Sequence, residues 1–110
     1  MDEEGNVPPI SEEGRAGIAR LLAKALNNNQ RLILEHLSDS RGGPITPQLV
    51  ALSSARKVPL STLKLNARIL RDLGLVSQED HSATLTESGR EVIFLLRAHL
   101  GQGLQIQEVN

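Results

Sequence analysis

The sequence predicts a mainly α-helical domain with one small β-hairpin, an α+β fold around a single core. Apolar residues recur at helical spacing in several segments, and two short strand candidates lie close together late in the chain. A length of 110 residues is enough for one modest core. We therefore expect one domain over residues 11–100, with a flexible acidic leader at 1–10 and a flexible tail at 101–110.

The first part of the domain predicts two helices separated by asparagines. Ser11 is a suitable N-cap for the first helix. The apolar stripe of that helix consists of Ile18, Leu21, Leu22, Ala25 and Leu26. Residues 27–29 are all asparagine and favour a cap or turn, because their amides compete for backbone hydrogen bonds. A second helix is expected over about residues 30–38, followed by a loop at 38–44.

The middle of the domain predicts two further helices. Ile45 is a lone apolar residue after the loop, enough for an edge strand of one residue. Thr46 and Pro47 then start a helix, with a hydroxyl at the N-cap and proline at the first helical position. Pro59 starts the next helix, and Gly74 suits the left-handed residue that ends it.

The last part predicts the hairpin and a closing helix. Residues 75–78 and 83–85 are strand candidates. Residues 79–82 between them lack the Asn-Gly signal of a tight turn, so the strand register stays open. Thr86 is suited to cap the closing helix. The apolar stripe of this helix consists of Val92, Ile93, Leu96 and Leu100.

Composition excludes several classes of function. The chain has no cysteine, and its three histidines lack metal-ligand spacing, so we expect no metal site. No nucleophile with a base, paired carboxylates or phosphate-binding glycine loop is recognisable, so we expect neither an enzyme nor a cofactor. No apolar run approaches the roughly 20 residues of a membrane span, and the acidic N-terminus is unlike a secretory signal. We expect a cytoplasmic protein.

The net charge of −1 conceals an uneven distribution. Residues 1–14 carry −5 and residues 77–110 carry −3, whereas residues 15–30 carry +3 and residues 31–76 carry +4. The basic excess therefore coincides with the central helices. The single aromatic residue, Phe94, argues against recognition of single strands by base stacking.

Three segments resemble a known family pattern. Two of these segments are residues 58–63, Val-Pro-Leu-Ser-Thr-Leu, and residues 70–76, which contain Leu70 followed by Leu-Gly-Leu-Val at 73–76. Together they resemble the recognition helix of winged helix-turn-helix regulators of the IclR, MarR and ArsR types. Residues 85–90, Leu-Thr-Glu-Ser-Gly-Arg, look like the second wing strand entering the closing helix. The resemblance covers about residues 30–100. It implies a winged helix-turn-helix with extra N-terminal and C-terminal helices that binds double-stranded DNA in transcription regulation, with residues 59–73 in the major groove.

The resemblance also implies which residues contact DNA. Basic residues that would contact phosphates are Arg56, Lys57, Lys64 and Arg71. Residues that would lie on the groove-facing side of the recognition helix are Ser61, Thr62, Leu65 and Arg68. The competing interpretation is a solvated helix face, with Arg68 paired to Asp72 four residues later.

The chain departs from these families in two places. Residues 79–81 put two carboxylates at the expected wing tip, where they would repel phosphate. Leu65 stands on the expected reading face, where it would contact either a thymine methyl group or a protein. These departures keep open an alternative function, a winged helix used as a protein-interaction module within a larger complex.

The first and last predicted helices lie outside the minimal DNA-binding motif. Their apolar stripes would either complete the core or join two copies of the chain around a two-fold axis. We expect a homodimer through these helices, which would space two recognition helices for a pseudo-palindromic site.

Overall fold

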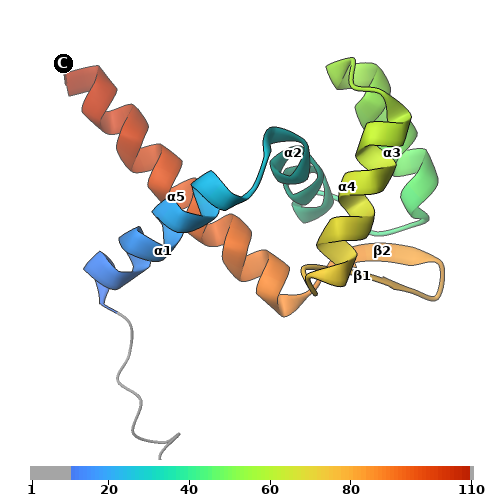
Figure 1. Ribbon diagram of the computed structural model, residues 1–110, viewed down its shortest axis with the longest axis horizontal. Helices are drawn as coiled ribbons and strands as arrows, with labels where there is room; N and C mark the ends of the chain where they lie inside the picture. Colours follow the sequence, from blue (N-terminus) through green and yellow to red (C-terminus); the bar gives the residue numbers. More distant parts are fainter. Residues whose placement is uncertain (1–10, 110) are drawn as a thin grey trace, which may run out of the picture.

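The computed structural model describes residues 11–109, with side chains as far as residue 99. The predicted leader at residues 1–10 lies outside the described residues. Five helices and one antiparallel hairpin form this part of the chain, which confirms the mainly α class with a small β-hairpin (Figure 1). The elements in chain order are α1 (Glu12–Ala25), α2 (Asn28–Ser38), α3 (Ile45–Arg56), α4 (Leu60–Asp72), β1 (Val76–Glu79), β2 (Ser82–Leu85) and α5 (Glu87–Val109).

Helix α2 is the central element of the fold. It packs against α4, β2 and α5. Helix α3 packs on α4, and β1 contacts α4, whereas α1 packs against α5 at the other end of the molecule (Figure 1). The chain therefore divides into a head, formed by α2, α3, α4 and the hairpin, and an arm, formed by α1 and α5.

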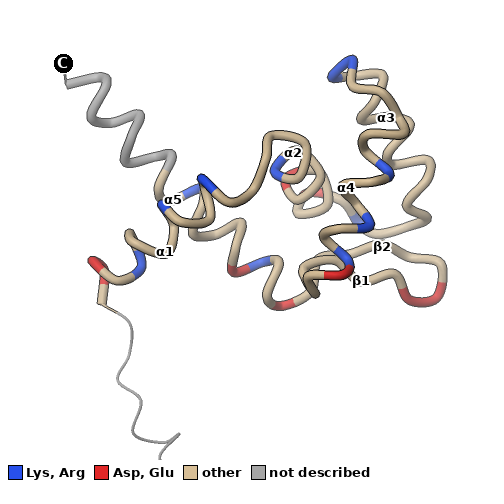
Figure 2. Tube along the Cα trace, viewed as in Figure 1, with Lys and Arg blue, Asp and Glu red and all other residues tan. Residues whose placement is uncertain are grey.

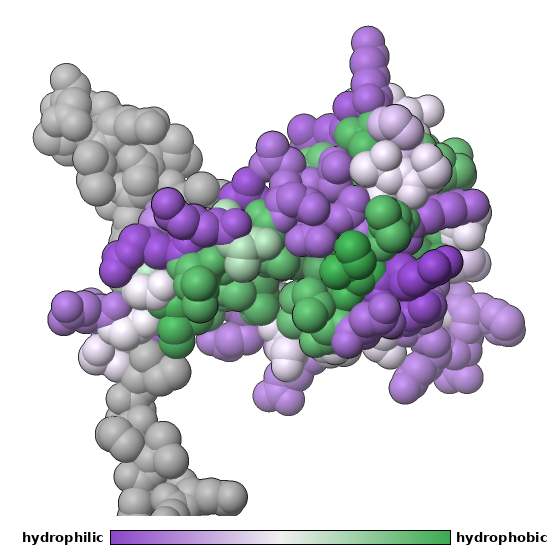
Figure 3. Space-filling model, viewed as in Figure 1, coloured by the Kyte–Doolittle hydropathy of each residue, from purple (hydrophilic) through white to green (hydrophobic). Residues whose placement is uncertain are grey.

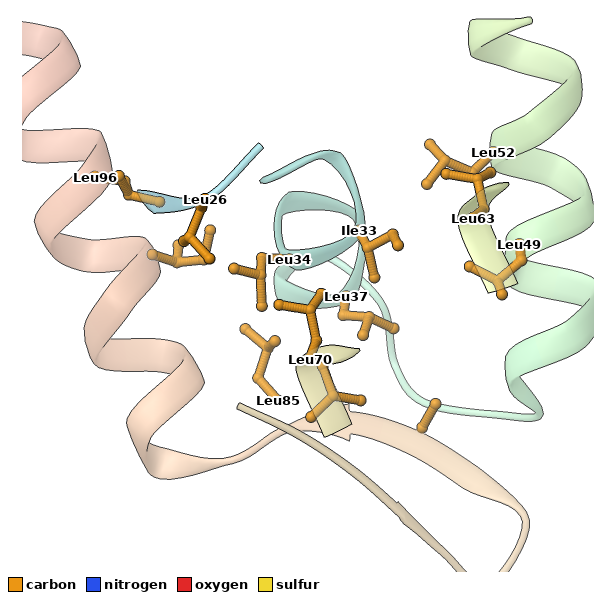
Figure 4. Close-up of a cluster of buried hydrophobic side chains, with 13 residues drawn as sticks. Leu26, Ile33, Leu34, Leu37, Leu49, Leu52, Leu63, Leu70, Leu85 and Leu96 are labelled. Atoms are coloured by element: carbon orange, nitrogen blue, oxygen red, sulfur yellow. The ribbon is translucent and has the colours of Figure 1, made fainter. Parts of the chain in front are cut away.

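The core is aliphatic and lies on both sides of α2. Figure 4 shows Ile33 pointing toward Leu63 and the leucines of α3, while Leu34 points the opposite way, toward Leu26 and Leu96. Ile33, Leu34 and Leu63 are fully buried, and each such side chain contributes about 1.5–3 kcal/mol relative to exposure. Because α2 contributes to both halves of the core, it couples the head to the arm.

The apolar stripe predicted for α1 is only partly buried. Leu26 is buried at the C-cap and Leu22 is half-buried, but Ile18, Leu21 and Ala25 are exposed. The one buried residue within α1 is the small Ala19. Since α5 is the main packing partner of α1, one narrow face of α1 finds cover and the larger side chains point away.

Of the three asparagines after α1, Asn27 forms the predicted cap, whereas Asn28 and Asn29 are the first two residues of α2. Asn27 is the N-cap of α2: its side chain accepts from the Gln30 N–H at 2.8 Å, and the Gln30 side chain accepts from the Asn27 N–H at 3.1 Å. This capping box starts α2 at Asn28, two residues before the predicted start. The Asn27 amide also donates to Asn66 Oδ1 of α4 at 3.1 Å.

The edge strand predicted at Ile45 is wrong, because Ile45 is the first residue of α3. Pro44 takes the N-cap position that the sequence suggests for Thr46. The strand-like pairing is made by Gly43, whose carbonyl accepts from the Ala83 N–H and whose N–H donates to Ser82 Oγ, both at 2.9 Å. Gly43 has a φ of +102°, a conformation that glycine adopts without strain.

Gly74 ends α4 in the predicted left-handed conformation, with a φ of +80°. The Gly74 N–H donates to the Arg71 carbonyl and the Leu75 N–H donates to the Leu70 carbonyl, each at 3.0 Å. These two bonds form a Schellman motif. Three residues, 73–75, connect α4 to β1.

The hairpin has a two-residue turn, which settles the register that the sequence left open. Val76 is paired with Leu85 and Glu79 with Ser82. Asp80 and His81 form the turn with φ values of +54° and +61°. Positive φ at both positions is the signature of a type I′ turn, and Asp and His adopt it more readily than most residues.

Thr86 joins the end of α4 to the start of α5. Its Oγ1 accepts from the Gly89 N–H at 3.0 Å, which confirms the predicted N-cap, and donates to the Gly74 carbonyl at 2.6 Å. Gly89 lies so close to the chain at Leu75 that a Cβ there would be 2.1 Å from the Leu75 carbonyl oxygen. Helix α5 runs to Val109, through the stretch for which the sequence predicts a flexible tail.

Candidate nucleic-acid interface

Helix α4 presents a basic stripe along one flank. Its buried side consists of Leu63, Asn66 and Leu70. Lys64, Arg68 and Arg71 are all exposed, and at 100° per residue they fall on the same side of that buried face. Figure 2 shows these positions as a row of basic residues along α4. The three predicted contact residues Lys64, Arg68 and Arg71 are therefore brought together.

The other flank of α4 is apolar. Leu65 is 57% exposed and Leu73 is 59% exposed, with the half-buried Ile69 between them in sequence. Ser61 and Asp72 are exposed on the outermost line between the two flanks. Leu65 thus borders the basic stripe, and α4 offers two chemically different surfaces to a partner.

Thr62 is less available than the sequence suggests. The residue is half-buried, and its carbonyl accepts from the Asn66 side-chain amide at 2.8 Å. Asn66 is itself buried and bonded to Asn27. Thr62 therefore lies on the side of α4 that turns toward the rest of the fold.

The basic stripe continues to the hairpin through Arg71. Its Nη1 donates to Gln78 Oε1 on β1 at 2.7 Å. A groove of about 300 Å³ lies between the start of α3, α4 and β1, and Thr46 and Gln78 line it beside the three basic residues. Sequence reasoning did not identify Thr46 or Gln78 as site residues. The contact with Gln78 depends on the strand register, for which the sequence contains no turn signal.

Arg56 and Lys57 lie apart from the other predicted residues. Both are exposed at the end of α3, where Lys57 is the C-cap with a φ of +56°. Figure 2 shows basic residues at the end of α3, apart from the basic residues along α4. They extend the line of positive charge without joining the groove that Lys64, Arg68 and Arg71 share.

The basic stripe is not neutralised within the described side chains. The ion pairs formed there are those of Arg97 with Glu35 at 2.7 Å and with Asp39 at 3.7 Å. The pairing of Arg68 with Asp72 that a solvated face would suggest is not formed, although both residues are exposed on α4. The charges of the stripe therefore face solvent.

The hairpin tip is acidic. Glu79 and Asp80 are both exposed at the turn, beside the exposed His81 (Figure 2). The two carboxylates directly follow Gln78, the residue that contacts Arg71, and the pair of Gln78 with Ala83 is next to the last pair before the turn. A polyanion on the basic stripe would be attracted by Arg71 and repelled by the two carboxylates next to Gln78.

No family model matches the chain, and neither a curated protein nor a solved structure is significantly similar to it. In the part of the chain that the structure describes, no helix combines the length and apolar character needed to cross a bilayer. No group of three His, Asp or Glu side chains among those residues is arranged to hold a metal ion. Function is therefore inferred from the residues and their arrangement.

Proposed function

We propose that the chain is a winged helix-turn-helix protein that binds double-stranded DNA and acts in transcription regulation. In this proposal α4 is the recognition helix, and the β1–β2 hairpin is the wing. The observation that carries it is the row of exposed cations on one flank of α4, formed by Lys64, Arg68 and Arg71, which form no ion pair with a described side chain. Phosphate contacts by Lys and Arg supply much of the affinity of proteins for DNA.

The dimensions of α4 suit this role. Its 13 residues span about 20 Å, and the major groove of B-DNA, about 12 Å wide, admits an α-helix. Arg68 lies at the middle of the stripe, where it would meet base edges, and Ser61 lies about two turns toward the N-terminus. Lys64 and Arg71 would contact phosphates on either side. The bond from Arg71 to Gln78 would orient that guanidinium where α4 meets the wing.

We also propose a homodimer through α1 and α5. The arm carries apolar side chains that the chain itself does not cover: on α1, Leu21 is 66% exposed and Ile18 is 38% exposed. Figure 3 shows apolar side chains gathered where α1 crosses α5. Burial of such side chains between two copies would favour association, and two α4 helices would then be available for two half-sites.

Duplex binding at two salt concentrations tests the DNA proposal. Affinity for a mixed-sequence duplex, measured by fluorescence anisotropy, should fall by orders of magnitude between about 50 and 200 mM salt. Lys64→Ala should weaken binding to all duplexes alike and lower the salt slope by about one. Lys24→Ala is the matched control, because Lys24 is an exposed lysine in the last turn of α1, outside the head. Its affinity and slope should equal those of the unaltered protein.

A winged-helix protein-interaction module is the second candidate function. It is favoured by the apolar flank with Leu65 and Leu73, and by the acidic hairpin tip. Absence of duplex binding at the lower salt concentration would overturn the DNA proposal. Stable association with a protein partner that is lost in Leu65→Ser would then support the module.

A further inference from the structure

A second groove lies where the head meets the arm. It has a volume of about 510 Å³ and lies between the end of α2, the 38–44 loop, β2 and α5. Small-ligand sites in proteins commonly have volumes of about 300–1,000 Å³. The basic stripe of α4 contributes no residue to this groove. Its lining combines apolar side chains with three arginines and contains no carboxylate.

The floor of the groove is aliphatic and one wall is aromatic. Leu37, Leu85 and Ile93 are buried core residues that also line the groove. Phe94 lines it as well, and its ring is largely exposed. An alkyl chain lying on this floor would remove apolar surface from water on both partners, at about 25 cal/mol for each Å² buried.

Arg97 is already occupied by other groups. Its Nη2 donates to Glu35 Oε1 and to Ser38 Oγ, each at 2.7 Å. The hydrogen bond to Glu35 raises the pKa of Arg97, and the charges of Glu35 and Asp39 act in the same direction. Arg97 therefore serves to hold α5 against the end of α2, and its positive charge is locally balanced.

Arg41 and Arg90 keep donors available for a ligand. Arg90 donates from Nη1 to the Leu85 carbonyl at 3.0 Å, which uses one of the five N–H donors of a guanidinium. Arg41, in the 38–44 loop, is exposed and forms no side-chain hydrogen bond or ion pair with the described residues. Two guanidinium groups from separate segments thus line one apolar groove, and no carboxylate is among the lining residues.

We propose that this groove binds an organic anion with an aliphatic body, a medium-chain carboxylate. Its carboxylate would accept hydrogen bonds from Arg41 and Arg90, and its chain would lie on Leu37, Ile93 and Phe94. Arginine binds carboxylates with paired N–H donors, and such charge-assisted bonds are about twice as strong as neutral ones. A small polyanion would satisfy the arginines but leave the apolar floor unused.

The ligand would connect two segments of the fold. Arg41 belongs to the loop whose Gly43 pairs with β2 through Ser82 and Ala83. Arg90 belongs to the first turns of α5 and is bonded to the end of β2. A carboxylate held by both arginines would therefore join the loop before α3 to α5, across the strand β2. The site does not depend on whether α4 binds DNA.

Octanoate and octanol are suitable probes, because they share the alkyl chain and differ in charge. Amide NMR chemical shifts of the full-length protein, without DNA, would be followed at millimolar ligand. Octanoate should shift the amides of the groove residues saturably, and octanol should bind roughly tenfold more weakly. Arg41→Gln should weaken octanoate binding roughly tenfold and leave octanol binding unchanged. Arg20→Gln, an exposed arginine of α1, is the control and should bind octanoate normally.

Three results would overturn the proposal. The first is equal affinity for octanol and octanoate, which would show an apolar surface without anion recognition. The second is unchanged octanoate binding in Arg41→Gln, whose unperturbed amide shifts elsewhere would show that it is folded. The third is inorganic phosphate shifting the same amides at the same concentrations, which would show a general anion site. Phe94→Ser provides an independent variant: it should weaken octanoate binding, and since Phe94 is exposed it should remain folded.

Discussion

Helices α1 and α4 have almost the same length, 14 and 13 residues, and both carry apolar stripes in the sequence. They are nevertheless held very differently. Helix α4 buries Leu63, Asn66 and Leu70 and packs against α2, α3 and β1. Helix α1 buries Ala19 and packs mainly against α5. In this pair, the helix that packs against more neighbouring elements is the one that buries more of its large apolar side chains.

The difference also separates two kinds of exposed surface. On α4, the exposed side chains belong to a helix whose C-terminal end is held by the Schellman motif at Gly74 and by the hydrogen bond from Thr86 to the Gly74 carbonyl. Such a surface is suited to recognition that requires fixed geometry. On α1, the exposed Leu21 belongs to a helix held on one face, which is suited to association with another copy.

The largest expected difference in stability is between two leucine truncations, one in α4 and one in α1. Leu70→Ala should lower the free energy of unfolding by about 2–5 kcal/mol, because Leu70 is fully buried and leaves a cavity. Leu21→Ala, measured in dilute solution by urea denaturation, should change it by less than about 0.5 kcal/mol. A loss for Leu21→Ala that grows with protein concentration would place Leu21 in the homodimer interface. A large loss independent of concentration would contradict the comparison.

A smaller effect is expected from adding a methyl group to a glycine in each region. Gly89 lies at the start of α5. Gly89→Ala should destabilise the protein by about 3 kcal/mol, because the new Cβ would collide with the Leu75 carbonyl. Gly17→Ala should stabilise it by up to about 1 kcal/mol, since alanine favours helix and the nearest atom, Arg20 Nη2, is 3.8 Å away. The melting temperatures of both variants, measured by thermal unfolding, test this expectation. Equal melting temperatures would show that the close approach at Gly89 is easily relaxed.

Arginine truncation tests whether the two helices differ in function. Arg68→Ala should weaken binding to a preferred duplex by about 1–3 kcal/mol if the side chain contacts a guanine. Arg20→Ala removes an equally exposed arginine from α1 and should leave duplex affinity unchanged. Competition between preferred and random duplexes provides the measurement. Equal losses for both variants would indicate a diffuse electrostatic effect instead of recognition by α4.

The smallest effect concerns the bond that links the two regions. Asn27, at the boundary of α1 and α2, donates to the buried Asn66 of α4. A double-mutant cycle of Asn27→Ala and Asn66→Ala, followed by urea denaturation, should give a coupling energy of about 1 kcal/mol. Additive losses would mean that each asparagine acts separately, Asn27 as a cap and Asn66 through the Thr62 carbonyl.

Several helix caps could be predicted from the sequence, whereas the starts of α2 and α3, the end of α5 and the burial of particular faces could not. Ser11, Asn27, Gly74 and Thr86 all act at helix ends as the sequence indicates. The hairpin register stayed open because Asp80 and His81 are not the usual turn pair. Of the predicted DNA-contacting residues, Lys64, Arg68 and Arg71 share one flank, since helical periodicity alone fixes their relative direction.

The chain alone therefore determined the order of helices and strands, the caps at Ser11, Gly74 and Thr86, and the row of cations on α4. These depend on hydrogen bonds and angular spacing among residues a few positions apart. Only the tertiary structure decided that Gly43, and not Ile45, pairs with β2, that Arg71 contacts Gln78, and that Leu21 is left exposed. Each of these depends on which distant surfaces meet, and local sequence patterns carry no record of such contacts.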